Sequence, residues 1–254
     1  MKNLQEEKQL QNRLLELADR ADRRGGRTFS EFLDMAGQDV ASRLKTPVAL
    51  SLEGGWPGAE RRVVCFGERE SWQEEWEAAV PVACLKISAA APKFSEKLTH
   101  RDFLGALMGL GFRREVLGDV IVSEKGDCAW LFCLESVADY ICDQLTQVRR
   151  TTVKVSRETA LPDFASELPQ EQTVNAASAR ADAMVAGVYN LSRSESGELF
   201  RKELVYINYR LASNPSAELK ENDLVSVRGY GRFIYCGAAG ETRSGRLRAR
   251  VRVF

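Results

Sequence analysis

The sequence is short of the residues on which most catalytic and metal sites depend. It contains a single histidine, His100, and its six cysteines include no Cys-x-x-Cys pair. A histidine-based triad or a zinc cluster therefore has almost no material, and we expect no metal site. Most of the cysteines lie within apolar stretches, so we interpret them as reduced, buried thiols.

Long apolar runs are also missing. No stretch approaches the roughly 18 to 20 uninterrupted apolar residues of a membrane span, and the opening MKNLQEEKQLQNR is too charged for a signal peptide. Hydrophobic residues make up 44% and charged residues 28% of the 254, which excludes a disordered or fibrous chain. We expect a soluble, cytoplasmic, monomeric protein without a membrane partner.

The formal net charge is zero, but the charges are unevenly distributed. Residues 1–78 hold 12 basic and 15 acidic side chains, and residues 79–175 hold 11 and 13. Residues 176–254 reverse the balance with 13 basic and 8 acidic side chains. Such asymmetry is typical of a chain in which one module meets nucleic acid.

Hydrophobic periodicity predicts three α+β domains. Residues 1–78 are expected to hold a helix over 4–24, a second helix from Ser30 and a β-hairpin. Residues 79–158 follow the order β-α-β-β-α-β of ferredoxin-like domains and RNA-recognition motifs. Residues 159–177 contain two prolines and are predicted to be a linker before a third domain at 178–254.

Two features of the middle domain invite a functional interpretation. Its third strand carries Trp130 and Phe132, which could stack on bases, but the basic-Gly-aromatic pattern of RNA readers is missing, and core packing is favoured. His100 and Asp102 suggest catalysis, but Thr99 and Asp102 have the spacing of a helix capping box, which is the better account. The glycines that follow suggest close backbone packing; they are Gly105, Gly109 and Gly111.

The most informative stretch begins at Arg180 and ends near Val227. A short helical run leads to Leu191-Ser192-Arg193-Ser194, a second helix, a strand ending at Asn208 and, further on, Asp223. This pattern resembles the small RNA-binding domain of the ribosomal-protein-S-four type, also called the alpha-L motif. Three residues depart from the family signature by standing where it has glycine; they are Glu203, Tyr209 and Asn222.

The start of the second helix of this motif is suited to binding a phosphate group. Unpaired backbone amides and the positive helix end lie beside Arg193, while Arg180, Arg201 and Lys202 would add charge. Each of these cations could instead be a solvated surface residue. In related heat-shock-type alpha-L proteins, the arginines before the first helix and at the start of the second contact rRNA, which the resemblance carries over to Arg180 and Arg193.

The last predicted strand, residues 246–253, alternates arginine with apolar residues. Period-two alternation places its four arginines on one face, where a polyanion would relieve their mutual repulsion. A solubilising edge strand is the alternative. The candidate RNA-binding residues of the chain are Arg180, Ser192, Arg193, Ser194, Arg201, Lys202, Asn208, Arg228, Arg232, Arg246, Arg248, Arg250 and Arg252.

Two further strings resemble the hallmarks of the bacterial YlmH family. One runs over residues 98–111 and closes with Gly118-Asp119-Val120-Ile121-Val122, and the other covers residues 54–62, GGWPGAERR. The likeness spans about residue 30 to 254 in the domain order of the family. It implies an RNA-binding protein on rRNA of the large ribosomal subunit, in quality control of stalled chains, with tRNA or peptidyl-tRNA as a second candidate partner.

Alpha-L modules also occur on enzymes that modify RNA, but the catalytic signatures are absent. Residues 1–175 contain no Gly-rich nucleotide loop. The string Gly245-Arg246-Leu247-Arg248 resembles that of a pseudouridine synthase but has arginine in place of the catalytic aspartate. We therefore expect a non-enzymatic protein without catalytic residues or cofactor. The alternatives are an accessory factor in RNA modification or ribosome assembly, and a protein-binding factor whose contact is Trp72 to Trp76.

Overall fold

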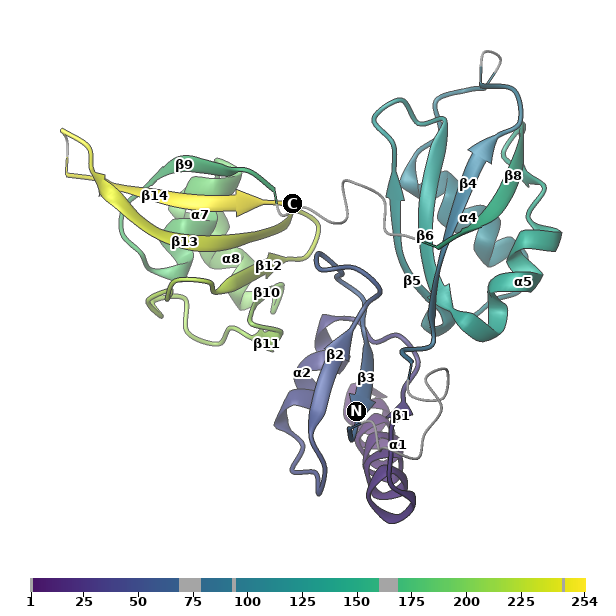
Figure 1. Ribbon diagram of the computed structural model, residues 1–254. Helices are drawn as coiled ribbons and strands as arrows, with labels where there is room; N and C mark the ends of the chain where they lie inside the picture. The colour runs from purple at the N-terminus through teal and green to yellow at the C-terminus, as the bar shows by residue number, and fades with distance from the viewer. Residues whose placement is uncertain (1, 69–78, 93–94, 160–168, 244) are drawn as a thin grey trace. The chain divides into compact units, whose positions relative to one another are not determined.

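The structure is a computed structural model that describes residues 2–68, 79–92, 95–159, 169–243 and 245–254 (Figure 1). It contains two compact units, Met1–Ser166 and Glu167–Phe254. Both combine helices with antiparallel sheets, so the α+β class is confirmed. The segment from Trp72 to Trp76 lies outside the described residues.

The first unit begins with a helical region and a small sheet. Its elements are α1 (Lys2–Arg24), β1 (Thr28–Phe29), α2 (Met35–Arg43), β2 (Leu50–Glu53) and β3 (Val63–Phe66). The three strands are antiparallel in the order β1-β3-β2, and β2 and β3 form the predicted hairpin. Leu14 and Ala18 of α1 pack with Phe66 of β3, because the apolar positions of α1 recur with the helical period.

The prediction that the second helix begins at Ser30 is wrong. Helix α2 begins at Met35, and Asp34 caps it by accepting a hydrogen bond from the Gly37 amide at 3.0 Å. The backbone before Asp34 is used by other segments: the Ser30 amide donates to the Val64 carbonyl at 3.0 Å, and that of Phe32 donates to Glu115 at 2.8 Å. Because these amides already bond to other segments, residues 30–33 cannot form a helical turn. The helix therefore begins after Asp34, whose side chain is a good N-cap.

The rest of the first unit is one sheet with two helices. Its elements are β4 (Val82–Ala89), α4 (His100–Gly109), the 3-10 turn η2 (Arg114–Val116), β5 (Leu117–Val122), β6 (Cys128–Leu134), α5 (Glu135–Gln144), β7 (Gln147–Val148) and β8 (Thr151–Glu158). The strands are antiparallel in the order β5-β6-β4-β8-β7. The main elements follow the predicted β-α-β-β-α-β order, with α4 and α5 on the same face of the sheet (Figure 1).

The capping box predicted at the start of α4 is confirmed. The Asp102 carboxylate accepts from the Thr99 amide at 2.8 Å and from its hydroxyl at 2.7 Å, which lowers the pKa of Asp102. The close packing predicted for the helix glycines is wrong, because a Cβ added at Gly105, Gly109 or Gly111 would meet no heavy atom within 4 Å. Gly105 therefore weakens the exposed middle of α4 without a packing benefit.

Replacing Gly105 with alanine is expected to stabilise the first unit by about 1 kcal/mol, since alanine loses less backbone entropy in a helix and has free space here. Urea unfolding followed by tryptophan fluorescence measures this, because all four tryptophans lie at or before position 130. Gly118→Ala is the control: its Cβ would lie 2.8 Å from the Phe32 ring, so this variant should lose stability. A loss of stability in Gly105→Ala would contradict the prediction.

The second unit is a six-stranded sheet with two helices. Its elements are β9 (Glu171–Ala176), α7 (Ala181–Tyr189), α8 (Arg193–Arg201), β10 (Val205–Ile207), β11 (Arg210–Leu211), β12 (Leu224–Val227), β13 (Gly231–Glu241) and β14 (Leu247–Val253). The strand order is β11-β10-β12-β13-β14-β9. Helices α7 and α8 lie together on one face (Figure 1), where Met184 and Phe200 pack with Phe233 and Val251 of the sheet.

Two predictions about the sheet of the second unit need correction. Residues 159–177 are not linker throughout, because Glu171–Ala176 form β9, which pairs with β14 in antiparallel register. Both prolines precede this strand, and its apolar positions, Val174 and Ala176, contribute to the core. The alternative that β14 is an edge strand is also wrong, since β13 and β9 flank it.

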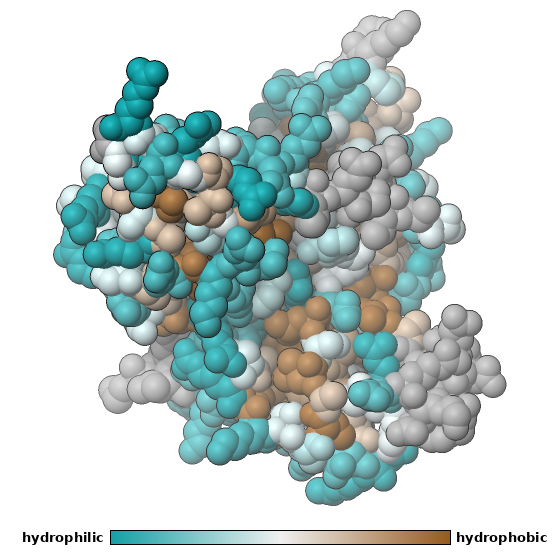
Figure 2. Space-filling model, turned by 60° about the vertical axis from the view of Figure 1, so that its left-hand side comes forward, coloured by the Kyte–Doolittle hydropathy of each residue, from teal (hydrophilic) through white to brown (hydrophobic). Residues whose placement is uncertain are grey.

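Hydrophilic side chains cover much of the face drawn in Figure 2, and apolar side chains form smaller patches among them. Within the described ranges, no helix is both long and apolar enough to span a membrane.

Candidate nucleic-acid interface

Helix α8 begins with a capping box that leaves its first two amides available. The Ser192 hydroxyl accepts from the Glu195 amide at 3.2 Å, and the Glu195 carboxylate accepts from the Ser192 amide at 2.8 Å. The amides of Arg193 and Ser194 precede the first helical hydrogen bond, which Ser196 donates to the Ser192 carbonyl at 3.0 Å. The side chain of Ser192 is thus occupied by capping, and two amides face outward from the helix end.

Arg193 is the exposed cation at this helix end. Among the described residues, its guanidinium takes part in neither an ion pair nor a hydrogen bond. The hydrogen bonds from Ser192 lower the pKa of Glu195, so an ionised carboxylate lies in the same turn. That carboxylate offsets part of the positive helix end, and Arg193 therefore has to supply the charge that would attract a phosphate.

A buried serine joins the starts of α7 and α8. The hydroxyl of Ser196 donates to the Asp182 carbonyl at 2.7 Å, and Ser196 is fully buried. The Asp182 side chain binds the Arg180 guanidinium with two contacts, at 3.0 and 2.7 Å. The structure therefore brings Arg180 and Arg193 to neighbouring helix starts. Sequence reasoning missed Ser196, whose signal was its helical spacing to the apolar Leu199 and Phe200.

The two cations at the other end of α8 differ in their surroundings. Arg201 forms an ion pair with Glu198 at 2.5 Å, while Lys202 caps the helix and is exposed. They lie about 12 Å along the helix axis from Arg193, at 1.5 Å per residue. A phosphate backbone could contact both ends of α8. At the second end, Lys202 would be the better contact, because Arg201 is already paired with Glu198.

All three residues that replace glycine in the alpha-L signature adopt the left-handed conformation. The φ angles are 56° at Glu203, 65° at Tyr209 and 71° at Asn222. At Glu203 the amide donates to Phe200 at 3.0 Å and the Leu204 amide donates to Leu199 at 3.0 Å, which completes a Schellman cap of α8. The loop geometry is therefore kept despite the side chains.

Replacing Glu203 with glycine is expected to stabilise the second unit by about 1 kcal/mol, because the left-handed conformation is unfavourable for residues with a Cβ. Glu203→Ala is the matched control: it removes the same charge but keeps the Cβ, and should gain far less. Thermal unfolding followed by circular dichroism measures both variants. Equal stability of the two would show that charge, not backbone conformation, decides the effect.

Asn208 stabilises the turn between β10 and β11 through its side-chain hydrogen bonds. Its amide group donates to the Asp223 carboxylate at 2.7 Å, and its carbonyl oxygen accepts from the Leu224 amide at 3.0 Å. Both ends of the side chain are therefore used within the unit, and its placement favours a structural role over RNA contact.

The arginines of β14 form a separate group. Arg248 and Arg250 are exposed, and Ala249 and Val251 between them are buried in the core under the helices. The predicted alternation is confirmed within the strand, so the arginine face lies on the side of the sheet opposite α8. Arg246 precedes the strand and donates to the Asn175 carbonyl at 3.3 Å.

A single carboxylate holds two arginines of this face. Glu171 of β9 accepts from Arg252 at 2.9 Å and lies 3.6 Å from Arg250, which also donates to the Cys236 carbonyl at 2.9 Å. The bond to Glu171 raises the pKa of Arg252, so it stays charged. The face thus keeps excess positive charge, with the guanidinium groups of Arg250 and Arg252 held in place.

Two predicted arginines lie in or next to the turn between β12 and β13. Arg228 is exposed. Arg232 is buried, and its guanidinium lies 4.6 Å from the centre of the Phe254 ring. This cation–π contact gives Arg232 a structural partner, and its burial argues against contact with RNA.

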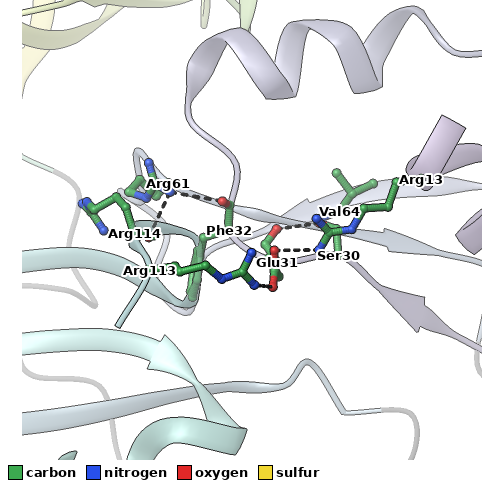
Figure 3. Close-up of polar contacts among 8 residues, drawn as sticks. All are labelled: Arg13, Ser30, Glu31, Phe32, Arg61, Val64, Arg113 and Arg114. Carbon is green, nitrogen blue, oxygen red and sulfur yellow. Dashed lines mark hydrogen bonds and ion pairs between the residues drawn. The ribbon is translucent and has the colours of Figure 1, made fainter. Parts of the chain in front are cut away.

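The two YlmH-like strings meet inside the first unit. The Asp119 carboxylate accepts from the Trp56 indole at 3.1 Å and from the amides of Glu60 and Arg61 at 2.7 and 3.1 Å. The Arg61 guanidinium donates to the carbonyls of Phe32 and Arg114 at 3.1 and 3.2 Å (Figure 3). These contacts join the N-terminal region to the five-stranded sheet, so the strings are structural in this chain.

The arginines at the junction of these two strings form contacts within the first unit. Burial lowers the pKa of Arg114 to about 10, and its guanidinium donates to the carbonyls of Leu117 and Gly118 at 2.5 and 3.0 Å. Glu31 bridges Arg13 and Arg113, each at 2.6 Å (Figure 3). Within the part of the chain that the structure describes, no three His, Cys, Asp or Glu residues gather as a metal site.

Comparison with known proteins supports a common origin for most of the chain. A family model described as a putative RNA-binding domain in YlmH matches residues 80–161. The chain is 30% identical over 230 residues to the ribosome-associated protein quality control protein P2 of Bacillus subtilis (strain 168), covering 87% of this chain and 84% of that protein. A solved structure, cell division protein ylmH from Streptococcus pneumoniae, is 20% identical with a TM-score of 0.47, covering 60% of this chain and 91% of that one.

Proposed function

The chain belongs to the YlmH family, and on that premise we propose that it is a non-enzymatic protein that binds rRNA of the large ribosomal subunit in the cytoplasm. The proposal places it in the quality control of stalled chains, the process named in the Bacillus subtilis relative. The observation that carries the RNA contact is the start of α8, where the exposed Arg193 lies beside two outward-facing amides.

In this proposal, a phosphate of folded rRNA docks at the start of α8. The amides of Arg193 and Ser194 and the Arg193 guanidinium would donate to its oxygens. Arg180 would add a weaker contact because Asp182 already occupies two of its five N–H groups. Lys202 and Arg201 would meet phosphates further along the backbone. Contacts of this kind recognise the shape of the RNA more than its base sequence.

The arginines of β14 extend the proposal to a second contact. They lie on the opposite face of the sheet from α8, so one phosphate cannot touch both groups. Arg246, Arg248, Arg250 and Arg252 would therefore meet a different stretch of RNA, either rRNA or a tRNA or peptidyl-tRNA on the same subunit. Asn208 and Arg232 are left out of the proposed surface because both side chains are used within the unit.

Sucrose-gradient sedimentation with purified large ribosomal subunits tests the proposal. Wild-type protein should migrate with the subunits at low salt and be released at moderate salt, since phosphate contacts weaken as salt rises. The Arg180→Ala/Arg193→Ala double variant should remain near the top of the gradient at both. Wild-type protein that stays at the top under all conditions would overturn the proposal and favour a different RNA or an assembly role.

A further inference from the structure

Few large apolar side chains are exposed in the described parts of the chain. Phe132, which the sequence offers as a stacking residue, is fully buried, and the Trp56 ring stacks over it with 6.1 Å between centroids. Core packing is therefore confirmed for Phe132. Among the described residues, the exposed ones are Met108, Tyr140 and Tyr230, and only Tyr230 lies in the second unit, where it is 48% exposed.

Tyr230 lies at the end of a tight turn between β12 and β13. Its amide donates to the Val227 carbonyl at 3.0 Å, and Val227 pairs with Gly231 across the turn. Gly229 and Gly231 both have positive φ, at 84° and 120°. A positive φ at the third residue of such a turn favours glycine, because a Cβ is strained there. The two glycines therefore give the backbone around Tyr230 a defined conformation.

The ring of Tyr230 packs against other aromatic rings. Its centroid lies 5.5 Å from that of Tyr189, with 53° between the planes, and Tyr189 in turn lies 6.1 Å from Phe233. Phe233 is fully buried in the core of the second unit. Within the described residues, the Tyr230 hydroxyl takes part in no hydrogen bond. A half-exposed ring held by a chain of rings from the core loses little side-chain entropy when a flat ligand stacks on it.

The turn that carries Tyr230 lies beside the end of α8. The amide of Arg228 donates to the Leu204 carbonyl at 2.9 Å, which brings the turn next to the segment that follows α8. Lys202, which caps the helix two residues before Leu204, is exposed, and so is the Arg228 side chain. Positive charge is therefore present on both segments that meet at this turn.

The start of α8 is also close to Tyr230. Tyr189, whose ring contacts that of Tyr230, is the last residue of α7 and precedes Arg193 by four residues. Four residues span at most about 14 Å when fully extended, which limits the distance from Tyr189 to the start of α8. One short stretch of RNA can therefore place a phosphate at Arg193 and a base at Tyr230.

The ligand that fits this arrangement is an unpaired RNA base. An exposed aromatic ring beside cations is the combination that binds single-stranded nucleic acid, since a base stacks on the ring and the cations attract the phosphates. A base inside a duplex presents only its edge, whereas an unpaired base in a loop or bulge of folded RNA can lie flat on a tyrosine. The excess of basic over acidic side chains in residues 176–254, 13 against 8, favours RNA over a protein partner.

We propose that Tyr230 stacks on an unpaired base of the same RNA whose phosphate docks at the start of α8. The inference rests on the proposed function and deepens it. Phosphate contacts position an RNA without distinguishing paired from unpaired residues, whereas stacking on Tyr230 requires an unpaired base. The second unit therefore selects a loop or bulge over a continuous duplex.

Binding of purified large ribosomal subunits by the full chain, over a series of potassium chloride concentrations, tests the proposal. Tyr230→Ala should weaken binding about tenfold, the usual effect of losing one stacked base. Tyr230→Phe should keep most of the affinity because its ring remains. Neither change removes a phosphate contact, so both should leave the slope of log affinity against log salt at the wild-type value. Arg193→Ala, by contrast, should lower the magnitude of that slope by about 0.9.

Two further variants make the Tyr230 result specific. Tyr230→Leu keeps an apolar side chain but has no ring to stack, so it should weaken binding nearly as much as Tyr230→Ala. If Tyr230→Ala does not fold, the comparison of Tyr230→Leu with Tyr230→Phe gives the same answer. Tyr140→Ala is the matched control, since Tyr140 is 52% exposed on α5 of the first unit, and it should change the affinity less than twofold.

The outcomes separate this inference from the proposed function. Wild-type affinity in Tyr230→Ala and Tyr230→Leu would overturn the stacking site, while binding of the subunits by wild-type protein would uphold the proposed function. A loss in Tyr230→Ala that Tyr230→Leu restores would also overturn stacking and would favour an apolar contact with a ribosomal protein. Wild-type protein that binds no subunits at any salt concentration overturns both proposals.

Discussion

Replacing Arg193 with alanine should weaken the binding of purified large ribosomal subunits by about 10- to 100-fold. A hydrogen bond to a charged group contributes about 1.5 to 3 kcal/mol, and each 1.4 kcal/mol is tenfold in affinity. The loss should be large because the ionised Glu195 in the same turn leaves Arg193 as the source of positive charge. Filter binding or light scattering at fixed salt gives the dissociation constants.

Two variants make the Arg193 result specific. Arg20→Ala removes the same charge from an exposed position on α1 and should change the affinity less than twofold. Arg180→Ala should fall between the two, because Asp182 already holds its guanidinium. If Arg20→Ala and Arg193→Ala weaken binding equally, net charge rather than the α8 helix start is responsible.

Replacing Asp119 with asparagine should destabilise the first unit by about 3 kcal/mol. One carboxylate oxygen accepts from both the Trp56 indole and the Glu60 amide, and the other accepts from Arg61. An asparagine NH₂ group would face N–H donors on one side, leaving partly buried donors without an acceptor. The change also removes a negative charge that favours the charged forms of the partly buried Arg61 and Arg114.

Urea unfolding followed by tryptophan fluorescence measures the Asp119 effect, since Trp56 itself contacts the carboxylate. Asp139→Asn is the control: this exposed residue pairs with Arg157 on the surface, and its loss should cost less than about 0.5 kcal/mol. A change of similar size in the two variants would show that Asp119 does not hold the N-terminal region to the sheet.

The periodic parts of the fold were predictable because local patterns match tertiary burial there. Helix α1, the order of elements from Val82 to Glu158 and the alternation of β14 all follow from side-chain periodicity. The capping boxes at Thr99 and Ser192 depend on residues three apart, which a sequence displays directly.

The errors arose where distant segments decide the local structure. Strand β9 has few apolar residues, and it forms because β14 offers it a complete hydrogen-bonding edge and Arg252 attracts Glu171. The segment at Ser30 likewise pairs with β3 rather than starting a helix. Such partners are more than 30 residues away, and no local pattern reveals them.

Part of the candidate site could also be read from the sequence. The spacing of Leu191 to Ser194 indicates the helix start, and the structure places Arg180 beside it through Ser196. What the spacing could not reveal is which polar side chains are already occupied. Asn208 and Arg232 are each engaged within the unit, which only the tertiary contacts show.

The salt dependence of binding to purified large ribosomal subunits tests the central claim most directly. Dissociation constants of wild type and Arg193→Ala are measured over a series of potassium chloride concentrations. We predict that log affinity falls linearly with log salt, and that Arg193→Ala lowers the magnitude of the slope by about 0.9, the value for one phosphate contact. Equal slopes for the two proteins would contradict phosphate binding at the start of α8.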